Sequence, residues 1–222
     1  MEAIQPWCQL DLTEVLTQIL PSSFLLLLAT TRLLLLLILS TRPESVSSVF
    51  AGVIMLAAVE SGDVKILAEL MRQDPGFDVN MGRGKFGDTL LHEACSGDSR
   101  SAVIPLLLAH PDIDVNARNK YGRPPFDSAC SERASCVREM LRDSRVKVNE
   151  ASSSWTPFYY AAGSGYLDVI RCWIASGRKI DLGKPGDIFI TDAIGAASMN
   201  GETEVVTYWR DSRRIQRKPD IK

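Results

Sequence analysis

The sequence predicts an all-α protein whose main part is a solenoid of about five helix-turn-helix units. The clearest unit is 155–182, where two short apolar runs are separated by the glycine-rich segment 163–165. The first run follows Thr156 and Pro157, a pair typical of the first positions of a helix. The second run has apolar residues at helical spacing and ends at Gly177. Because two short helices cannot bury their apolar faces alone, this unit predicts neighbouring copies of itself.

Copies of the unit recur along the chain in register. The start of the second helix is repeated after Gly62, Gly165 and Gly201. Extended segments recur as well, since Asn80 and Asn116 are 36 positions apart and Asn116 and Asn149 are 33 apart. The openings of the first helix are repeated as Thr89-Leu90-Leu91-His92, Pro124-Pro125-Phe126-Asp127 and Thr156-Pro157-Phe158-Tyr159.

This pattern resembles the ankyrin repeat, a family whose unit of about 33 residues is a turn plus two helices. The resemblance covers roughly residues 50–211, in five units. It implies that the ring of His92, at the family's usual histidine position, bonds backbone between repeats. The third repeat departs from the pattern, with Asp127 where the histidine is expected and Arg133 where a glycine is expected. We therefore expect an irregular turn between the two helices of that repeat.

Composition and motifs predict a protein without enzymatic activity. The chain has 222 residues and a net charge of −2, and this near-neutral charge gives no reason to expect a nucleic-acid partner. With only two histidines, it also has few candidates for general acid-base catalysis. It has no nucleophile elbow, phosphate-binding loop or zinc-ligand spacing, and we predict no catalytic residues, no metal and no cofactor. Five scattered cysteines are typical of buried small side chains in a reducing compartment, so we predict the cytoplasm, with the nucleus not excluded.

Two local motifs allow another interpretation. The glycines at 82, 84 and 87 have the spacing of a dinucleotide-binding turn, but the required strand-turn-helix context is missing. We interpret them as a tight turn. His92, Glu93 and Cys95 offer metal-ligand atoms on one helix, yet a zinc site needs three or four ligands and nearby cysteines have the wrong spacing. A structural role for His92 is the favoured interpretation.

We divide the chain into 1–48, an N-terminal hydrophobic helical segment with a linker, 49–211, the repeat domain, and 212–222, a basic C-terminal tail. Two interpretations of the first part stay open. Residues 24–39 form an apolar run near the lower length limit of a membrane span, interrupted by Arg32. Alternatively, residues 9–39 are a soluble helical module that resembles an F-box, which implies a substrate adaptor of a ubiquitin ligase.

The resemblance implies that the protein is an interaction scaffold, which binds a partner protein through the concave face and the turns of the array. Residues at normally solvent-facing positions are our candidates for partner binding, because aromatic and arginine side chains dominate interface energetics. They are Lys85, Phe86, Asp88, Lys120, Tyr121, Arg123, Trp155 and Tyr160. We expect Phe86, Tyr121 and Trp155 to follow one another at about one repeat spacing. The alternative is that Trp155 and Tyr160 only pack against adjacent turns.

Overall fold

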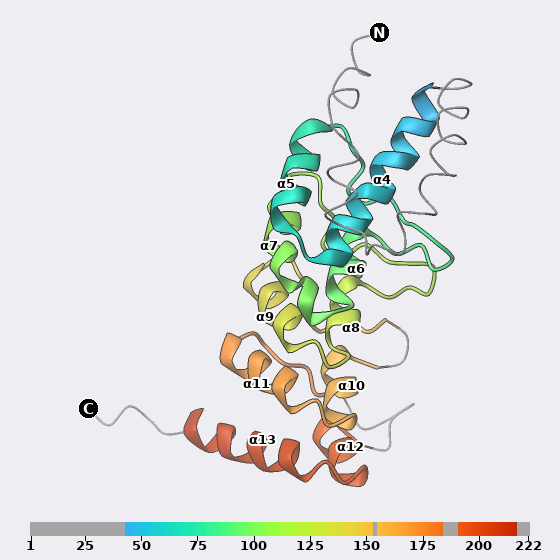
Figure 1. Cartoon of the computed structure of the whole chain (residues 1–222). Coiled ribbons are helices and arrows are strands. Elements are labelled where there is room, and N and C mark those ends of the chain that lie inside the picture. Colours follow the sequence, from blue (N-terminus) through green and yellow to red (C-terminus); the bar gives the residue numbers. More distant parts are fainter. Residues whose placement is uncertain (1–42, 153–154, 184–190, 217–222) are drawn as a thin grey trace, which may run out of the picture. The chain divides into compact units, whose positions relative to one another are not determined.

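The computed structural model describes residues 43–152, 155–183 and 191–216, and within these ranges the secondary structure is helical (Figure 1). The segments 9–39 and 24–39, and the end of the basic tail, lie outside the described residues. Among the described residues no helix is both long and apolar enough to cross a membrane. The three-part division of the chain made above stays a prediction.

The chain separates into two compact units, of which the first is Met1–Val79. Its described part is a helix pair, α4 (Pro43–Ser61) and α5 (Val64–Gln73). Gly62 turns the chain between them with a φ of 70°, in the left-handed region that favours glycine. Asp63 then caps α5, because its Oδ1 accepts hydrogen bonds from the backbone N–H groups of Lys65 (2.9 Å) and Ile66 (3.0 Å). Met55 and Leu67 lie in the buried core of this pair.

The described part of the second unit, Asn80–Lys222, contains four further helix pairs. The first helices are α6 (Leu90–Cys95), α8 (Pro125–Ala129), α10 (Pro157–Gly163) and α12 (Ala193–Met199). The second helices are α7 (Ile104–Leu108, preceded by the 3₁₀ helix η1, Asp98–Val103), α9 (Ala134–Arg142), α11 (Leu167–Ser176) and α13 (Thr203–Gln216). Within this unit the two sets of helices form two layers (Figure 1). The predicted all-α solenoid of repeated helix pairs is confirmed.

Asparagines at the ends of successive repeats join each repeat to the next. Asn116 donates a hydrogen bond from Nδ2 to the carbonyl of Arg145 (3.0 Å) and accepts one at Oδ1 from the N–H of Lys147 (2.9 Å). Asn80 and Asn149 make the same pair of bonds to the repeat that follows each of them. Each side-chain amide satisfies two backbone groups that no strand pairs, which explains the asparagines that recur in the sequence.

The third repeat has the irregular turn that the sequence predicts. In the fourth repeat Gly165 takes the left-handed conformation, with a φ of 75°, nine positions after the helix cap Thr156. In the third repeat Glu132 takes it instead, with a φ of 73°, eight positions after the cap Pro124. The turn is therefore one residue shorter, and a side chain other than glycine occupies its strained position.

Candidate functional site

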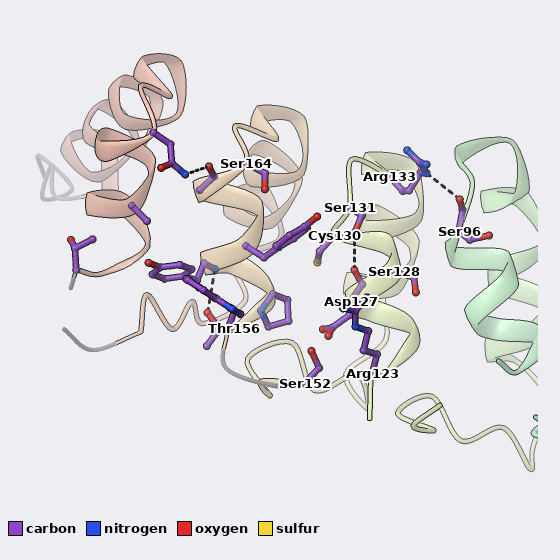
Figure 2. A pocket seen from close by; sticks show the side chains of 18 of the residues that line it. Ser96, Arg123, Asp127, Ser128, Cys130, Ser131, Arg133, Ser152, Thr156 and Ser164 are labelled. Carbon is purple, nitrogen blue, oxygen red and sulfur yellow. Dashed lines mark hydrogen bonds between the residues drawn. The ribbon is translucent and has the colours of Figure 1, made fainter. Parts of the chain in front are cut away.

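A groove of about 880 Å³ lies along the layer of first helices in the second unit (Figure 2). Its walls come from the ends of α6 and α12 and from the lengths of α8 and α10 with the segments that precede them. Polar, aromatic and small side chains share the lining: Ser96, Arg123, Asp127, Ser128, Cys130, Ser131, Arg133, Ser152, Trp155, Thr156, Tyr159, Tyr160, Ser164, Met199 and Asn200. A volume of this size lies in the range of ligand-binding clefts in proteins.

The groove includes the space between α8 and α10. Helix α6 packs closely on α8, and α10 packs closely on α12, but α8 and α10 make little direct contact. On the opposite layer α9 and α11 do pack closely, so the third and fourth repeats remain joined through their second helices. The opening on the first-helix side is therefore a local feature of this repeat junction.

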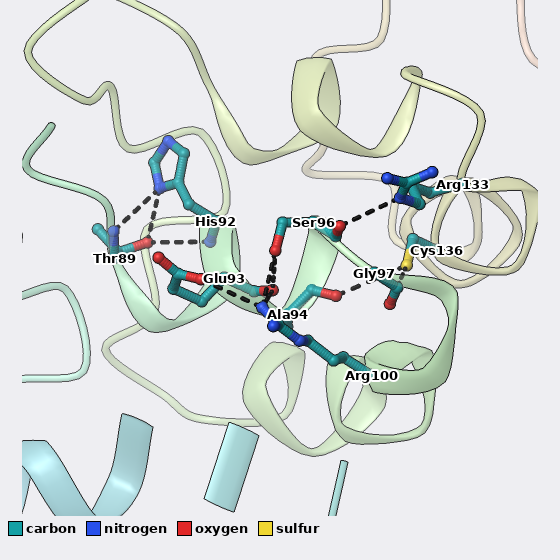
Figure 3. A network of polar contacts seen from close by, with 9 residues as sticks. All are labelled: Thr89, His92, Glu93, Ala94, Ser96, Gly97, Arg100, Arg133 and Cys136. Atoms are coloured by element: carbon teal, nitrogen blue, oxygen red, sulfur yellow. Dashed lines mark hydrogen bonds and ion pairs between the residues drawn. The ribbon is translucent and has the colours of Figure 1, made fainter. Parts of the chain in front are cut away.

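At the preceding junction, between the second and third repeats, His92 bridges the two repeats. His92, the third residue of α6, is buried, and its Nε2 donates to the carbonyl of Arg123 in the next repeat (2.9 Å). Its Nδ1 therefore accepts the N–H of Thr89 (3.2 Å), as Figure 3 shows. Burial lowers the pKa of His92, while the bond to Arg123 opposes the shift. The structural interpretation of His92 is confirmed, and this ring bridges two repeats in its neutral form.

An arginine strengthens the same junction from the other side of α6. Arg133 donates from Nε to the carbonyl of Ser96 (3.1 Å), and Arg100 contacts Glu93 and Ser96 at the end of the same helix (Figure 3). The bond from Arg133 satisfies the carbonyl of Ser96, just past the end of α6. Arg133 also lines the groove, so it lies both at this junction and at the groove.

Asp127 occupies in α8 the place that His92 occupies in α6, the third residue of the helix. Figure 2 shows it next to Arg123 and Ser152. Its Oδ1 is buried and has no hydrogen-bond partner within the part of the chain that the structure describes. Burial raises the pKa of Asp127, and the hydroxyl of Ser152 and the charges of Arg123 and Arg118 oppose that rise. A carboxylate in this state costs free energy of folding at neutral pH.

The raised pKa gives a prediction for stability. A folded state that holds a proton more tightly than the unfolded state loses stability as the pH rises from the ordinary value of 3.8 through the raised pKa. Asp127→Asn should therefore be more stable than the wild type at neutral pH by about 1 kcal/mol. The difference should shrink as the pH falls through that window, and urea unfolding at several pH values measures it. Asp112→Asn, at an exposed position outside the groove, is the control. A variant less stable than the wild type at neutral pH would show that Asp127 makes a stabilising bond.

The structure places the candidate residues of the sequence in two adjoining groups. Arg123, Trp155 and Tyr160 line the groove. Lys85, Phe86, Asp88, Lys120 and Tyr121 lie on the turns that precede α6 and α8, outside the groove lining. Arg123 belongs to the same turn as Tyr121, so the two groups meet there.

The turn residues are held together by backbone contacts. The N–H of Lys120 donates to the carbonyl of Phe86 (2.9 Å), and Asn119 Nδ2 donates to Asp88 (2.8 Å). The rings of Phe86 and Tyr121 consequently lie 5.5 Å apart, in contact rather than at the expected one-repeat spacing. Asp88 thus positions the turn. The glycines at 82, 84 and 87 form the tight turn that we predicted. Gly84 and Gly87 have positive φ, and the backbones of Arg83 and Asp88 pair across the turn.

The four candidate aromatics are partly packed and partly exposed. Trp155 stacks on Tyr159, with ring centroids 4.6 Å apart, and Tyr160 lies near Tyr166. Phe86, Tyr121, Trp155 and Tyr160 nevertheless remain 47%, 60%, 44% and 45% exposed. We call these four residues the aromatic strip. Packing on one side and exposure on the other therefore hold these rings in place at the surface.

Sequence reasoning missed most of the groove lining. Ser128, Ser131, Ser152, Ser164 and Asn200 carry no signal by residue type, because serine and asparagine are common at helix ends. Asp127 did carry a signal, since it replaces the expected histidine, but its burial and its lack of a partner depend on the separation of α8 from α10.

A comparison with protein families identifies the repeats. Residues 54–152 match a model described as ankyrin repeats, in three copies. These residues belong to the ankyrin-repeat family. The chain also resembles a protein named SMC5-SMC6 complex localization factor protein 1, from Bos taurus and from Homo sapiens. Identity is 31% over 96 residues, which is 42% of this chain but only 9% of each relative. Ankyrin repeats are generally non-enzymatic modules that bind other proteins.

Proposed function

We propose that this ankyrin-repeat protein is a scaffold that binds a segment of a partner protein along the aromatic strip and the adjoining groove. The observation that carries the proposal is the aromatic strip itself. Large exposed aromatic rings are costly to leave in water, and such rings account for much of the energy of protein interfaces. All four lie on turns or first helices of consecutive repeats, next to one continuous groove.

The charges around the strip favour a partner with acidic residues beside apolar anchors. Lys85, Lys120 and Arg123 are exposed and make no ion pair within the described ranges of the chain. The nearby Arg118, by contrast, is already paired with Glu150 (2.8 Å). Free cations at the rim of an apolar surface steer an acidic segment towards it and raise the rate of association.

The relatives support only the general role. Their name refers to localisation of the SMC5-SMC6 complex, and the matched segment is less than a tenth of their length. We therefore propose binding to a partner protein without assigning that complex to this chain. The cytoplasm stays the predicted compartment.

Truncating two rings of the strip tests the proposal. In the variant Tyr121→Ala/Trp155→Ala, capture of partner proteins should fall by more than about tenfold, because two interface aromatics each contribute about 1 kcal/mol or more. Proteins captured from lysate by the immobilised full chain and by the variant are compared by quantitative mass spectrometry. The captured proteins themselves are then assayed in purified form.

The matched control removes two exposed apolar side chains of α4 and α5, in Val53→Ala/Val64→Ala. This control should capture the wild-type partners at wild-type levels. Circular dichroism of both variants should keep the helical spectrum of the wild type. A folded strip variant that retains every partner would place the binding surface elsewhere on the chain.

A further inference from the structure

The third residue of the first helix differs between the second and third repeats. In α6 this residue is His92, which donates a hydrogen bond across the junction to Arg123. In α8 it is Asp127. A carboxylate can only accept hydrogen bonds when it is ionised, so Asp127 cannot make the bond to a carbonyl that His92 makes. The junction between the third and fourth repeats therefore lacks a histidine bridge.

The same junction is also open on the side of the first helices. Helices α8 and α10 make little contact, and the groove opens between them. Asp127 stands in that opening with Oδ1 buried and, among the described residues, without a hydrogen-bond partner. A buried acceptor without a partner costs free energy, which a hydrogen-bond donor brought by the partner segment would recover.

The charges beside Asp127 determine which donor fits. Arg123 and Arg133 line the same groove, and no ion pair is formed by either within the described parts of the chain. Arg123 and Arg118 already act on the Asp127 carboxylate from nearby. A third cation would be repelled by these guanidinium groups. A neutral N–H donor can bond to Oδ1 without that repulsion, and Trp155 and Tyr160 offer apolar surface to the rest of the side chain.

We propose that Asp127 selects the partner segment by accepting, at Oδ1, a hydrogen bond from a side-chain amide of asparagine or glutamine. This inference rests on the proposed function, because it assigns a role to one position within the same binding surface. It adds an element of specificity: an amide seated between the third and fourth repeats, with acidic residues of the segment directed to the basic rim.

The test uses the full chain and a library of short random peptides displayed on phage. Peptides selected on the wild type should share asparagine or glutamine at one position, near an apolar residue. The dissociation constants of the selected peptides are then measured by fluorescence anisotropy. Asp127→Leu should weaken binding by about 10–100-fold, since the acceptor is lost. Asp127→Asn should weaken it by about tenfold or less, because an acceptor oxygen remains. Asp112→Leu is the matched control and should bind as the wild type does.

Changing the peptide keeps the test decisive even if Asp127→Leu fails to fold. Replacing the shared amide by leucine should weaken binding to the wild type, and replacing it by lysine should weaken it as well. Stronger binding of the lysine peptide would overturn the proposal in favour of a cationic side chain. Peptides that lose affinity with Trp155→Ala but are indifferent to Asp127 would overturn this inference and leave the proposed function intact. Selected peptides indifferent to the whole aromatic strip would contradict the proposed function itself.

Discussion

Trp173→Ala should lower the free energy of unfolding by about 3–5 kcal/mol, the largest effect that we expect of a single substitution in this chain. Trp173 lies in α11 and is 0% exposed. Its ring makes edge-to-face contacts with Phe126 of α8 (centroids 5.1 Å apart) and with Phe158 of α10 (5.2 Å). Truncation would leave a large cavity between the third and fourth repeats, where α8 and α10 give each other little support.

Equilibrium urea unfolding, followed by circular dichroism, measures this loss. Trp173→Phe serves as the control, because it keeps a ring and removes an indole N–H that is buried without a partner among the described residues. We expect it to cost much less than the alanine variant. Since each repeat of a solenoid contacts only its neighbours, the alanine variant should also separate unfolding into two transitions. A single transition near that of the wild type would mean that the repeats collapse around the missing ring.

The sequence was most informative where one residue controls local backbone geometry. Thr156 caps α10 by accepting the N–H of Tyr159 (3.2 Å), and Gly177 ends α11 with a φ of 67°. Pro105 is accommodated because α7 begins only at Ile104, after a 3₁₀ segment. Such features depend on a few neighbouring residues, so their physical signals can be read from the order of the amino acids.

Contacts between repeats were harder to predict, because they depend on which side chains reach across a junction. Arg178 follows α11, and its guanidinium donates to the carbonyls of Asp143 (2.9 Å) and Val146 (2.6 Å) at the end of the preceding repeat. Arg145 makes a comparable contact to Leu108 (2.6 Å). In the sequence both arginines are ordinary surface cations. Their roles become apparent only when the stacking of the helices places carbonyls of the preceding repeat within reach.

The groove was also hard to predict, because it too depends on how neighbouring repeats pack. The sequence placed aromatic and basic residues on solvent-facing positions, and the structure finds Phe86, Tyr121, Trp155 and Tyr160 exposed. The sequence could not show that α8 and α10 make little contact, because such spacing depends on side chains from several elements, among them Trp173 of α11. Binding surfaces between repeats are therefore set by the core as much as by the residues that line them.

Gly165→Val should destabilise the protein by about 1–2 kcal/mol or more, and should lower the melting temperature further than Ser164→Val. Gly165 turns the chain between α10 and α11 with a φ of 75°, and its N–H donates to the carbonyl of Ala162 (3.2 Å). A β-branched side chain is strained there whatever space surrounds it. A Cβ atom would also meet the carboxylate of Glu202, although that flexible side chain can move away.

Two companion variants separate these causes in thermal unfolding. Ser164 is exposed and has a φ of −95°, so Ser164→Val tests bulk at the neighbouring position without left-handed strain. Gly165→Asn adds a side chain that tolerates the left-handed region, and it should fall between the wild type and Gly165→Val. If Gly165→Asn is as damaging as Gly165→Val, collision with Glu202 rather than backbone strain limits this turn. Equal melting temperatures for Gly165→Val and Ser164→Val would contradict the left-handed geometry, because only one of the two positions should then be sensitive.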